Sequence, residues 1–437
     1  MASSPRSPLD EAHGKRLQGD LEGAARLALA LLERDPAQLG AASLLASMLA
    51  AEEKGLVAGE AAVRLVDAFV RRGDLPEAVV AARTARVAGE DGDAALERIA
   101  EAFGEGSERL GDAPPTPPPL PSEIEVPKDL AKRKGQALWE RADEALQALL
   151  GWDDPVDAES ELPRLPLFSE LEPEPLSELL AAFEVRELDG GQKAIEQGRE
   201  GNEAFVVVRG VLEVVREGDE RTVLAALGPG AIFGEMALVS DAPRAASVEA
   251  AEPVTLLVVS REKLEGVAEK APAVAQELSA FCRGRMLANL MRHSAILGAV
   301  HAQERQALME RFAPHHFEAG EALVEEGSEG QGLFLIASGG VEVVGKDADG
   351  DELRIAELGP GDVVGEISLV LRRPANATVR ALHRTVALEL TREEFQKAIK
   401  EHPTLLGELY EMATQREEET RTVVAQEALD VEDVVLL

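Results

Sequence analysis

The chain has 437 residues and a formal net charge of −36, with 81 acidic against 45 basic side chains and 45% hydrophobic residues. This length suggests two to four domains of roughly 100–200 residues each. Such an acidic surface argues against binding to nucleic acid or to anionic membranes, because both require a basic footprint. The sequence contains no stretch of about 18 apolar residues that would predict membrane insertion and no apolar signal core at its start, so we expect a cytoplasmic protein.

Residues 1–106 form the first predicted region, which is helical. Ala and Leu recur there at helical spacing, without the alternation of a strand. Residues 18–25 and 72–79 resemble each other, and each segment places a Gly-Asp pair at a turn between two helices. This resembles tetratricopeptide repeats, although the large aromatic positions of that motif are mostly missing. Repeat-like hairpins and an unrelated helical bundle both remain open, and either would be an interaction module for an unidentified protein partner.

Residues 107–126 are predicted to be a proline-rich linker. Consecutive prolines favour an extended polyproline II conformation, which makes a semi-rigid spacer. A docking site for a proline-reading domain is the alternative interpretation. A helical connector, residues 127–160, follows and contains Trp139. We expect the spacer to uncouple the helical module from the rest of the chain.

Beyond the connector, short runs of Val, Leu and Phe alternate with glycine-containing turns, and this pattern occurs twice. The matching positions of the first and second copies are Gly198 and Gly327, Phe205 and Phe334, Gly210 and Gly339, Gly230 and Gly361, and Gly234 and Gly365. A period of about 130 residues fits two tandem domains. Short strands with regular turns predict antiparallel, jelly-roll-like β-barrels with flanking helices. The expected fold is a multidomain α+β chain, with barrels over 161–292 and 293–412 and an acidic, then apolar tail over 413–437.

The first copy carries residue types suited to a cyclic nucleotide. Gly234 opens a short helical turn whose free N–H groups can receive an anion. Glu235 can accept hydrogen bonds from a sugar hydroxyl, and Arg244 can make a bidentate contact with a phosphate. Small side chains at 245–246 leave room for a phosphate to reach the backbone. The predicted binding residues are Phe233, Gly234, Glu235, Met236, Ala237, Arg244, Ala245, Ala246 and Ser247.

This segment resembles the phosphate-binding cassette of the cyclic-nucleotide-binding domain family, which is found in regulatory subunits of cAMP-dependent protein kinase, catabolite activator proteins and cyclic-nucleotide-gated channels. The resemblance covers residues 162–412. It implies that Glu235 bonds the ribose 2′-hydroxyl and that Arg244 pairs with the cyclic phosphate. In this family a hydroxyl after the arginine favours guanine, so Ala245 implies that cAMP is the ligand and that cGMP binds less well. An intact but empty cassette is the alternative.

The second copy keeps the length and frame of the cassette but lacks its arginine. Ala375 stands where the first copy has Arg244, and Asn376 replaces Ala245. Losing such a charged contact costs roughly 2–5 kcal/mol. A silent structural domain is therefore one interpretation, and weak or altered binding, with help from nearby arginines, is the other. The residues of this weak second site are Gly365, Glu366, Ile367, Ser368, Arg372, Arg373, Asn376, Ala377 and Thr378.

No catalytic constellation, metal site or cofactor is predicted, and the lone cysteine, Cys282, is expected to be buried and inert. No helix-turn-helix follows the second barrel, which argues against a transcription factor. The main hypothesis is a cAMP-sensing regulatory or adaptor protein, not an enzyme, that binds nucleotide at its first barrel. The alternatives are a scaffold whose barrels bind no nucleotide, and a regulatory subunit of a protein kinase, for which we find no convincing inhibitor segment.

Overall fold

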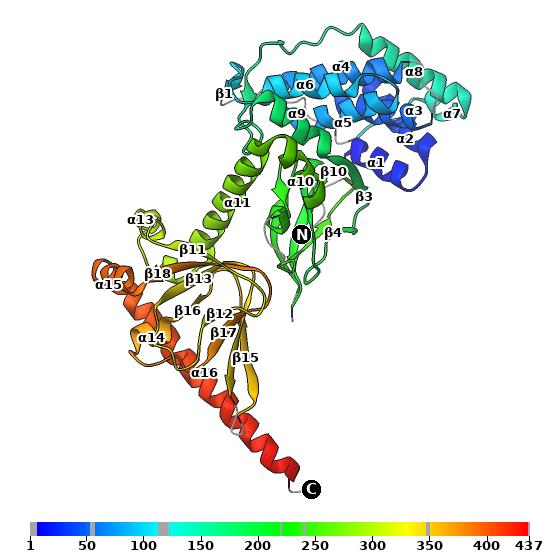
Figure 1. The fold of residues 1–437 in the computed structure, drawn as a ribbon. Helices are drawn as coiled ribbons and strands as arrows, with labels where there is room; N and C mark the ends of the chain where they lie inside the picture. The colour runs from blue at the N-terminus through cyan, green and yellow to red at the C-terminus, as the bar shows by residue number, and fades with distance from the viewer. Residues whose placement is uncertain are drawn as a thin grey trace. The chain divides into compact units, whose positions relative to one another are not determined.

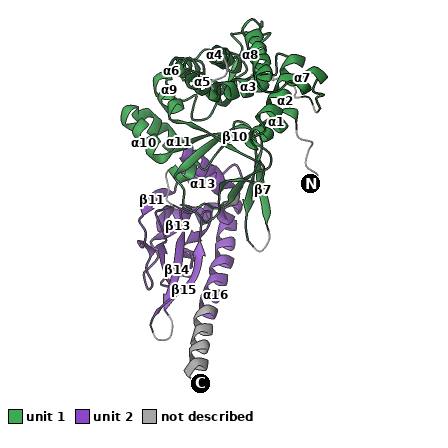
Figure 2. Cartoon of the chain, turned by 90° about the vertical axis from the view of Figure 1, so that its right-hand side faces the viewer, with its two compact units in different colours: residues 1–238, 244–281 green, residues 239–243, 282–437 purple. Residues whose placement is uncertain are grey.

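The computed structural model describes residues 7–52, 57–111, 121, 123–218, 221–238, 242–346 and 350–435 (Figure 1). Most of the proline run and residues 239–241 of the predicted cassette lie outside the described residues. The chain divides into two compact units (Figure 2). Unit 1 comprises residues 1–238 and 244–281, and unit 2 comprises residues 239–243 and 282–437. None of the described helices is both long and apolar enough to cross a membrane.

In the described part of unit 1, helices come first. Their bounds are α1 (Pro8–Leu17), α2 (Leu21–Arg34), α3 (Leu39–Ala51), α4 (Ala58–Arg71), α5 (Leu75–Val87) and α6 (Gly92–Phe103). Gly19 and Gly73 take positive φ angles of 85° and 72° at the turns before α2 and α5. The following residues, Asp20 and Asp74, cap those helices by accepting a hydrogen bond from the first turn. The predicted Gly-Asp turns are confirmed, because glycine tolerates a left-handed backbone and Asp is a preferred N-cap.

The predicted connector contains α7 (Lys128–Lys132) and α8 (Gln136–Leu150), and α8 packs back against α2, α3 and α4. Its buried face includes Trp139 and Leu146. Next to this layer, the buried Arg72 guanidinium donates two hydrogen bonds, of 2.7 and 2.8 Å, to the carboxylate of Asp154. A short parallel pair joins β1 (Leu110–Gly111) to β2 (Leu162–Pro163). The connector is thus part of the helical layer.

The first predicted barrel consists of two four-stranded sheets, ordered β3-β10-β5-β8 and β4-β9-β6-β7. The strands are β3 (Glu184–Leu188), β4 (Lys193–Ile195), β5 (Glu203–Arg209), β6 (Leu212–Arg216), β7 (Thr222–Leu227), β8 (Ile232–Phe233), β9 (Ser247–Ala250) and β10 (Val254–Ser260). Helices α9 (Pro173–Ala182) and α10 (Arg261–Lys270) flank them. The antiparallel jelly-roll-like fold is confirmed. Among the described residues no strand pair joins the two sheets, so they do not form a closed barrel.

The helical region and the first domain share one hydrophobic core. Val206 and Val208 on β5, with Leu257 and Val259 on β10, belong to the same buried cluster as α1 to α6 and α8. Ion pairs cross the same interface, from Arg16 to Glu187 and from Arg209 to Asp10. The expectation that the proline spacer uncouples the helical module is therefore wrong for unit 1, because the module packs directly on the sheet.

Unit 2 repeats the strand order of the first domain, with sheets β11-β18-β13-β16 and β12-β17-β14-β15. Its strands are β11 (Ala313–Phe317), β12 (Ala322–Val324), β13 (Gly332–Ser338), β14 (Val341–Lys346), β15 (Glu352–Leu358), β16 (Val363–Val364), β17 (Thr378–Ala381) and β18 (Thr385–Thr391). Its helices are α12 (Ala295–Gly298), α13 (Arg305–Met309), α14 (Glu366–Val370), α15 (Arg392–Glu401) and α16 (Pro403–Val435), and α11 (Pro272–His293) contains residues of both units. The region predicted to be a tail after residue 412 is instead a continuation of α16, since it contains no Gly or Pro that would end a helix.

Candidate functional site

The first cassette begins where β8 meets β5. Phe233 pairs with Phe205 across these strands, and their rings stack with centroids 4.9 Å apart. The next residue, Gly234, has φ +75°, and a Cβ there would lie 3.1 Å from both the Phe205 ring and the carbonyl oxygen of Glu203. Only glycine fits this conformation without strain. It directs the chain into the short 3-10 helix η1 (Glu235–Leu238).

Arg244 reaches back to the start of this turn. Its guanidinium donates hydrogen bonds to the carbonyl oxygens of Gly234 (2.9 Å) and Glu203 (2.8 Å). Burial lowers the pKa of Arg244, while Glu203 and Glu235 oppose that shift electrostatically. Arg244 forms no ion pair within 4 Å in the described part of the chain. A half-buried cation with only neutral acceptors can pair with an incoming anion.

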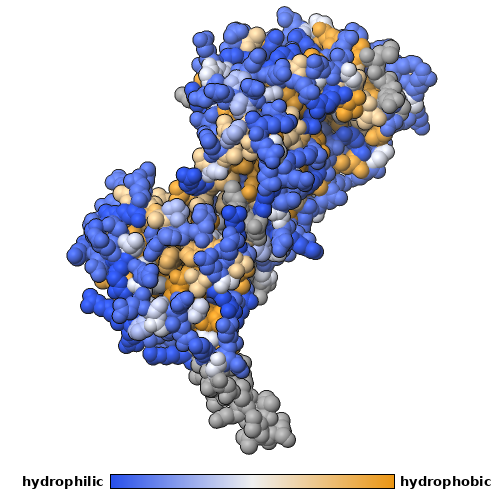
Figure 3. Space-filling view, in the orientation of Figure 1, coloured by the Kyte–Doolittle hydropathy of each residue, from blue (hydrophilic) through white to orange (hydrophobic). Residues whose placement is uncertain are grey.

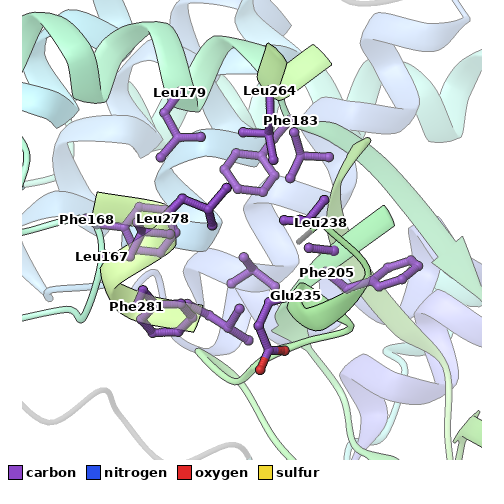
Figure 4. Close-up of a pocket in the computed structure, with 14 residues that line it drawn as sticks. Leu167, Phe168, Leu179, Phe183, Phe205, Glu235, Leu238, Leu264, Leu278 and Phe281 are labelled. Atoms are coloured by element: carbon purple, nitrogen blue, oxygen red, sulfur yellow. The ribbon is translucent and has the colours of Figure 1, made fainter. Parts of the chain in front are cut away.

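Glu235 is buried at the first position of η1, with 5% of its surface exposed. It lies at the edge of a small apolar cavity of about 20 Å³ beneath the cassette, and Figure 4 shows its carboxylate directed away from the surrounding apolar side chains. Leu238, at the other end of η1, lines the same cavity with Leu264 of α10 and Leu278 of α11. Arg261, the first residue of α10, donates a hydrogen bond to the carbonyl oxygen of Ala237. The turn η1 is therefore bonded directly to α10 and shares the lining of its cavity with α10 and α11.

The structure thus brings Gly234, Glu235 and Arg244 together, but two predicted binding residues have other partners. Phe233 is buried in the core between the sheets. The hydroxyl of Ser247 accepts a hydrogen bond from the backbone N of Gln197 (3.0 Å) and lies 3.1 Å from a carboxylate oxygen of Glu217. Both side chains brace the cassette. Met236, Ala245 and Ala246 remain at least partly exposed beside it.

The second cassette has the same backbone frame as the first. The N–H of Gly327 donates to the carbonyl oxygen of Ala375 at 2.8 Å, as that of Gly198 does to Arg244 at 2.8 Å. Gly365 has φ +87°, close to the value at Gly234. Ala375 therefore occupies the position of the first cassette's arginine. Thr378 repeats the bracing role of Ser247, since its hydroxyl accepts a hydrogen bond from the N–H of residue 326.

Arg372 and Arg373, the replacement cations expected from the sequence, do not line the cavity beside the second cassette. Arg373 pairs with Glu417 of α16 at 2.9 Å. The cation that does line the cavity is Arg416 of α16, which donates a 3.1 Å hydrogen bond to Glu366. It was missed because no local motif indicates where a helix about 50 residues downstream packs.

Residues 185–271 and 314–402 each match the sequence model described as "Cyclic nucleotide-binding domain". A cAMP-dependent protein kinase regulatory subunit from Yarrowia lipolytica is 30% identical over 233 residues, which are 53% of this chain and 58% of that protein. The corresponding subunit from Dictyostelium discoideum is 29% identical over 67% of this chain and 80% of its own length.

Among solved structures, the regulatory domain of Toxoplasma gondii PKA, co-crystallised with cAMP, covers 57% of this chain and 92% of its own. Its sequence identity is 23% and its TM-score is 0.28. The chain spans less than two thirds of the length of the Yarrowia subunit that it matches. The curated relatives are regulatory subunits, which supports the prediction of a regulatory protein and not an enzyme.

Proposed function

We propose that this chain, which carries two tandem cyclic nucleotide-binding domains and is homologous to the regulatory subunits of cAMP-dependent protein kinase, is a cAMP-responsive regulator that binds the nucleotide at its first domain. The observation that carries the proposal is the presence, at one end of η1, of a buried carboxylate, Glu235, and of the Arg244 guanidinium, whose hydrogen-bond acceptors are neutral carbonyl oxygens. In a chain of net charge −36, an anionic ligand requires such a local cation.

In the proposed binding step, the Arg244 guanidinium exchanges its carbonyl acceptors for the oxygens of the cyclic phosphate. Its present partners, the carbonyl oxygens of Gly234 and Glu203, are neutral. A cyclic phosphate offers charged oxygens to the same fork of donors, and charge-assisted hydrogen bonds are roughly twice as strong as neutral ones. Glu235 is an acceptor for the ribose hydroxyl. Losing the guanidinium's contact with Gly234 would free the start of η1 to move.

We predict that Arg244→Ala weakens cAMP binding by about 30-fold or more, since truncating one partner of a buried charged contact costs roughly 2–5 kcal/mol. Isothermal titration of the wild-type chain should give one cAMP per chain. Arg199→Ala is the matched control, because Arg199 is exposed and pairs locally with Glu196. Equal cAMP affinity in the wild-type and Arg244→Ala chains would contradict the assignment of the site.

The second prediction concerns the base. Ala245 is exposed beside the phosphate arginine and has no hydroxyl to offer. We therefore expect cAMP to bind more tightly than cGMP, and Ala245→Thr to narrow the difference, because a hydroxyl can hydrogen-bond to the guanine amino group. Competition titrations with both nucleotides measure the ratio. A preference for cGMP in the wild-type chain would show that the base is selected elsewhere.

A protein kinase catalytic subunit is the partner class favoured by the relatives' identity. The paired arginines Arg71 and Arg72 are a weak sequence candidate for an inhibitor segment, and the structure argues against them because Arg72 is buried against Asp154. A kinase assay with added chain, with and without cAMP, tests for this partner class. Inhibition that cAMP relieves supports a kinase regulator, and no effect on kinase activity would favour an adaptor.

A further inference from the structure

A cavity of about 310 Å³ lies in unit 2 between the second cassette, the strands beside it and α16. Its volume is at the lower end of the range for small-molecule sites. The apolar part of its lining comes from the strands and includes Val324, Val343, Ile355, Leu358, Val364 and Val379. Figure 3 shows apolar side chains reaching the surface of unit 2 in the region of β12, β16 and β17. These walls are suited to a flat, apolar ring system.

The polar groups of the cavity gather around the cassette. Glu366 is 3% exposed and Ser368 is 2% exposed, and the Ser368 hydroxyl has no hydrogen-bond partner within the described residues. Asn376 and Thr420 complete the polar lining. A buried hydroxyl without a partner costs free energy, so a ligand that supplies the missing bond is favoured. A carboxylate is an acceptor, which suits it to ligand hydroxyls.

The charge of the cavity differs from that of the first site. Its charged lining residues are Glu366, Glu419 and Arg416, and Ala375, 7% exposed, takes the place of the phosphate arginine. Arg416 is already engaged with Glu366, Asp362 and the carbonyl oxygen of Val363. The cavity therefore has no uncommitted cation, and a phosphate buried in it would be unpaired.

We propose that this cavity binds an uncharged ribonucleoside rather than a cyclic nucleotide, with the ribose hydroxyls on Glu366 and the base against the apolar strands. A nucleoside offers a vicinal diol to the carboxylate and a base whose edge can hydrogen-bond to the Asn376 amide, and it brings no charge into the site. The inference does not depend on which nucleotide binds at the first domain, because it rests on residues of unit 2 alone.

Arg416 competes with this ligand for Glu366. Burial raises the pKa of Glu366 even though Arg416 lowers it, so the ion pair does not fully offset the cost of burying the carboxylate. A diol that replaces the guanidinium would release Arg416. Because Arg416 lies on α16, nucleoside binding would loosen the central part of that helix from the cassette.

The test is isothermal titration of the full chain carrying Arg244→Ala, which disables the first site. Adenosine, guanosine, cytidine and uridine are the probes, and cAMP and cGMP are the comparison. We expect at least one nucleoside to bind with one equivalent per chain, and both cyclic nucleotides to bind about 30-fold more weakly or worse. The wild-type chain should then bind cAMP and the nucleoside at separate sites.

Further variants, made in the Arg244→Ala chain, identify the side chains that contact the nucleoside. Glu366→Gln should weaken nucleoside binding by about tenfold or more, since it replaces a charged acceptor by a neutral one. Ala375→Arg should make the cavity bind cyclic nucleotides more tightly than nucleosides. Arg416→Ala should raise nucleoside affinity, whereas Arg421→Ala, an exposed arginine on the same helix, should leave it unchanged.

Two outcomes would overturn the proposal. One is cAMP or cGMP binding at the second cavity as tightly as any nucleoside in the Arg244→Ala chain. The other is the absence of nucleoside binding in both the Arg244→Ala and the Arg244→Ala/Arg416→Ala chains, with thermal unfolding showing that unit 2 is folded. The first site has its own test, which is the difference in cAMP affinity between the wild-type chain and the Arg244→Ala chain.

Discussion

Two carboxyl groups at the start of α5 couple the stability of unit 1 to pH. The Asp74 side chain caps the helix by accepting a 3.1 Å hydrogen bond from the N–H of Glu77. Burial raises the pKa of Asp74 to about 6. Burial and the neighbouring Asp74 carboxylate raise the pKa of Glu77 to about 8, although Arg209 acts in the opposite direction. The folded chain therefore holds these protons more tightly than the unfolded chain does.

The sign of the effect follows from this difference. Between the ordinary glutamate pKa of 4.5 and the folded value of about 8, the folded state binds more protons, so the free energy of unfolding falls as pH rises. The Glu77→Gln variant has no ionisable group at this position. We therefore predict that its Tm falls less between pH 5 and pH 8 than the Tm of the wild-type chain. Glu101→Gln, at an exposed position on α6, is the control. If the Tm of the Glu77→Gln chain fell with pH as steeply as that of the wild-type chain, Glu77 would not be the source of the pH dependence.

At the scale of single elements, the predicted end of the second domain falls inside helix α16. The second domain was expected to end at residue 412, but the helix continues to Val435. Ala413, just past that boundary, is 0% exposed, and Arg416 and Thr420 line the cavity. The helix is thus a structural part of unit 2 at least as far as Thr420.

We predict that a chain ending at Met412 loses about 3 kcal/mol of stability in unit 2, because Glu366 would be left buried without its partner. A chain ending at Thr422 keeps Arg416 and Thr420 and should unfold at the wild-type temperature. Calorimetric scans of both truncations and the full chain make the comparison. The same Tm for both truncations would show that α16 contributes nothing beyond its first turns.

Local backbone requirements explain what the sequence predicted well. The repeated glycines at 210 and 339 both take positive φ, at 83° and 89°, so each marks the same turn, between strands of the two different sheets, in its own domain. The site's Gly234, Glu235 and Arg244 were found for a similar reason, since they lie within one continuous segment. Arg416 could not be found this way, because its approach to Glu366 depends on the packing of a distant helix.

Considered across unit 1, the main feature that the sequence analysis missed is the helical layer on the first sheet. A signal for it was present. Residues 205–208 and 256–259 are continuous apolar runs, whereas a sheet with one solvated face shows alternation. In the structure Val207 and Leu256 face the core between the sheets, and Val208 and Leu257 face the helices.

This arrangement predicts that both faces of β5 contribute to stability. Val208→Ala, on the helical side, should lower the free energy of unfolding by about 1–3 kcal/mol, as Val207→Ala on the inner side should. Val223→Ala, at a position on β7 that is 48% exposed, should change it by less than about 0.5 kcal/mol. Denaturant titrations of the three variants measure the differences. A neutral Val208→Ala variant would mean that the helical layer does not stay on the sheet in solution.

The shared core also sets an order of events during synthesis. Helices α1 to α6 leave the ribosome before β5 and β10, whose outer side chains complete their burial. At roughly 5–20 residues per second, the chain from Phe103 to Val259 takes on the order of ten seconds or more to make. For that interval the nascent helical layer presents an apolar face with nothing to cover it. A chaperone that binds exposed apolar helices would therefore bind the nascent chain early. The chaperone would be released when β10 emerges and covers the helices.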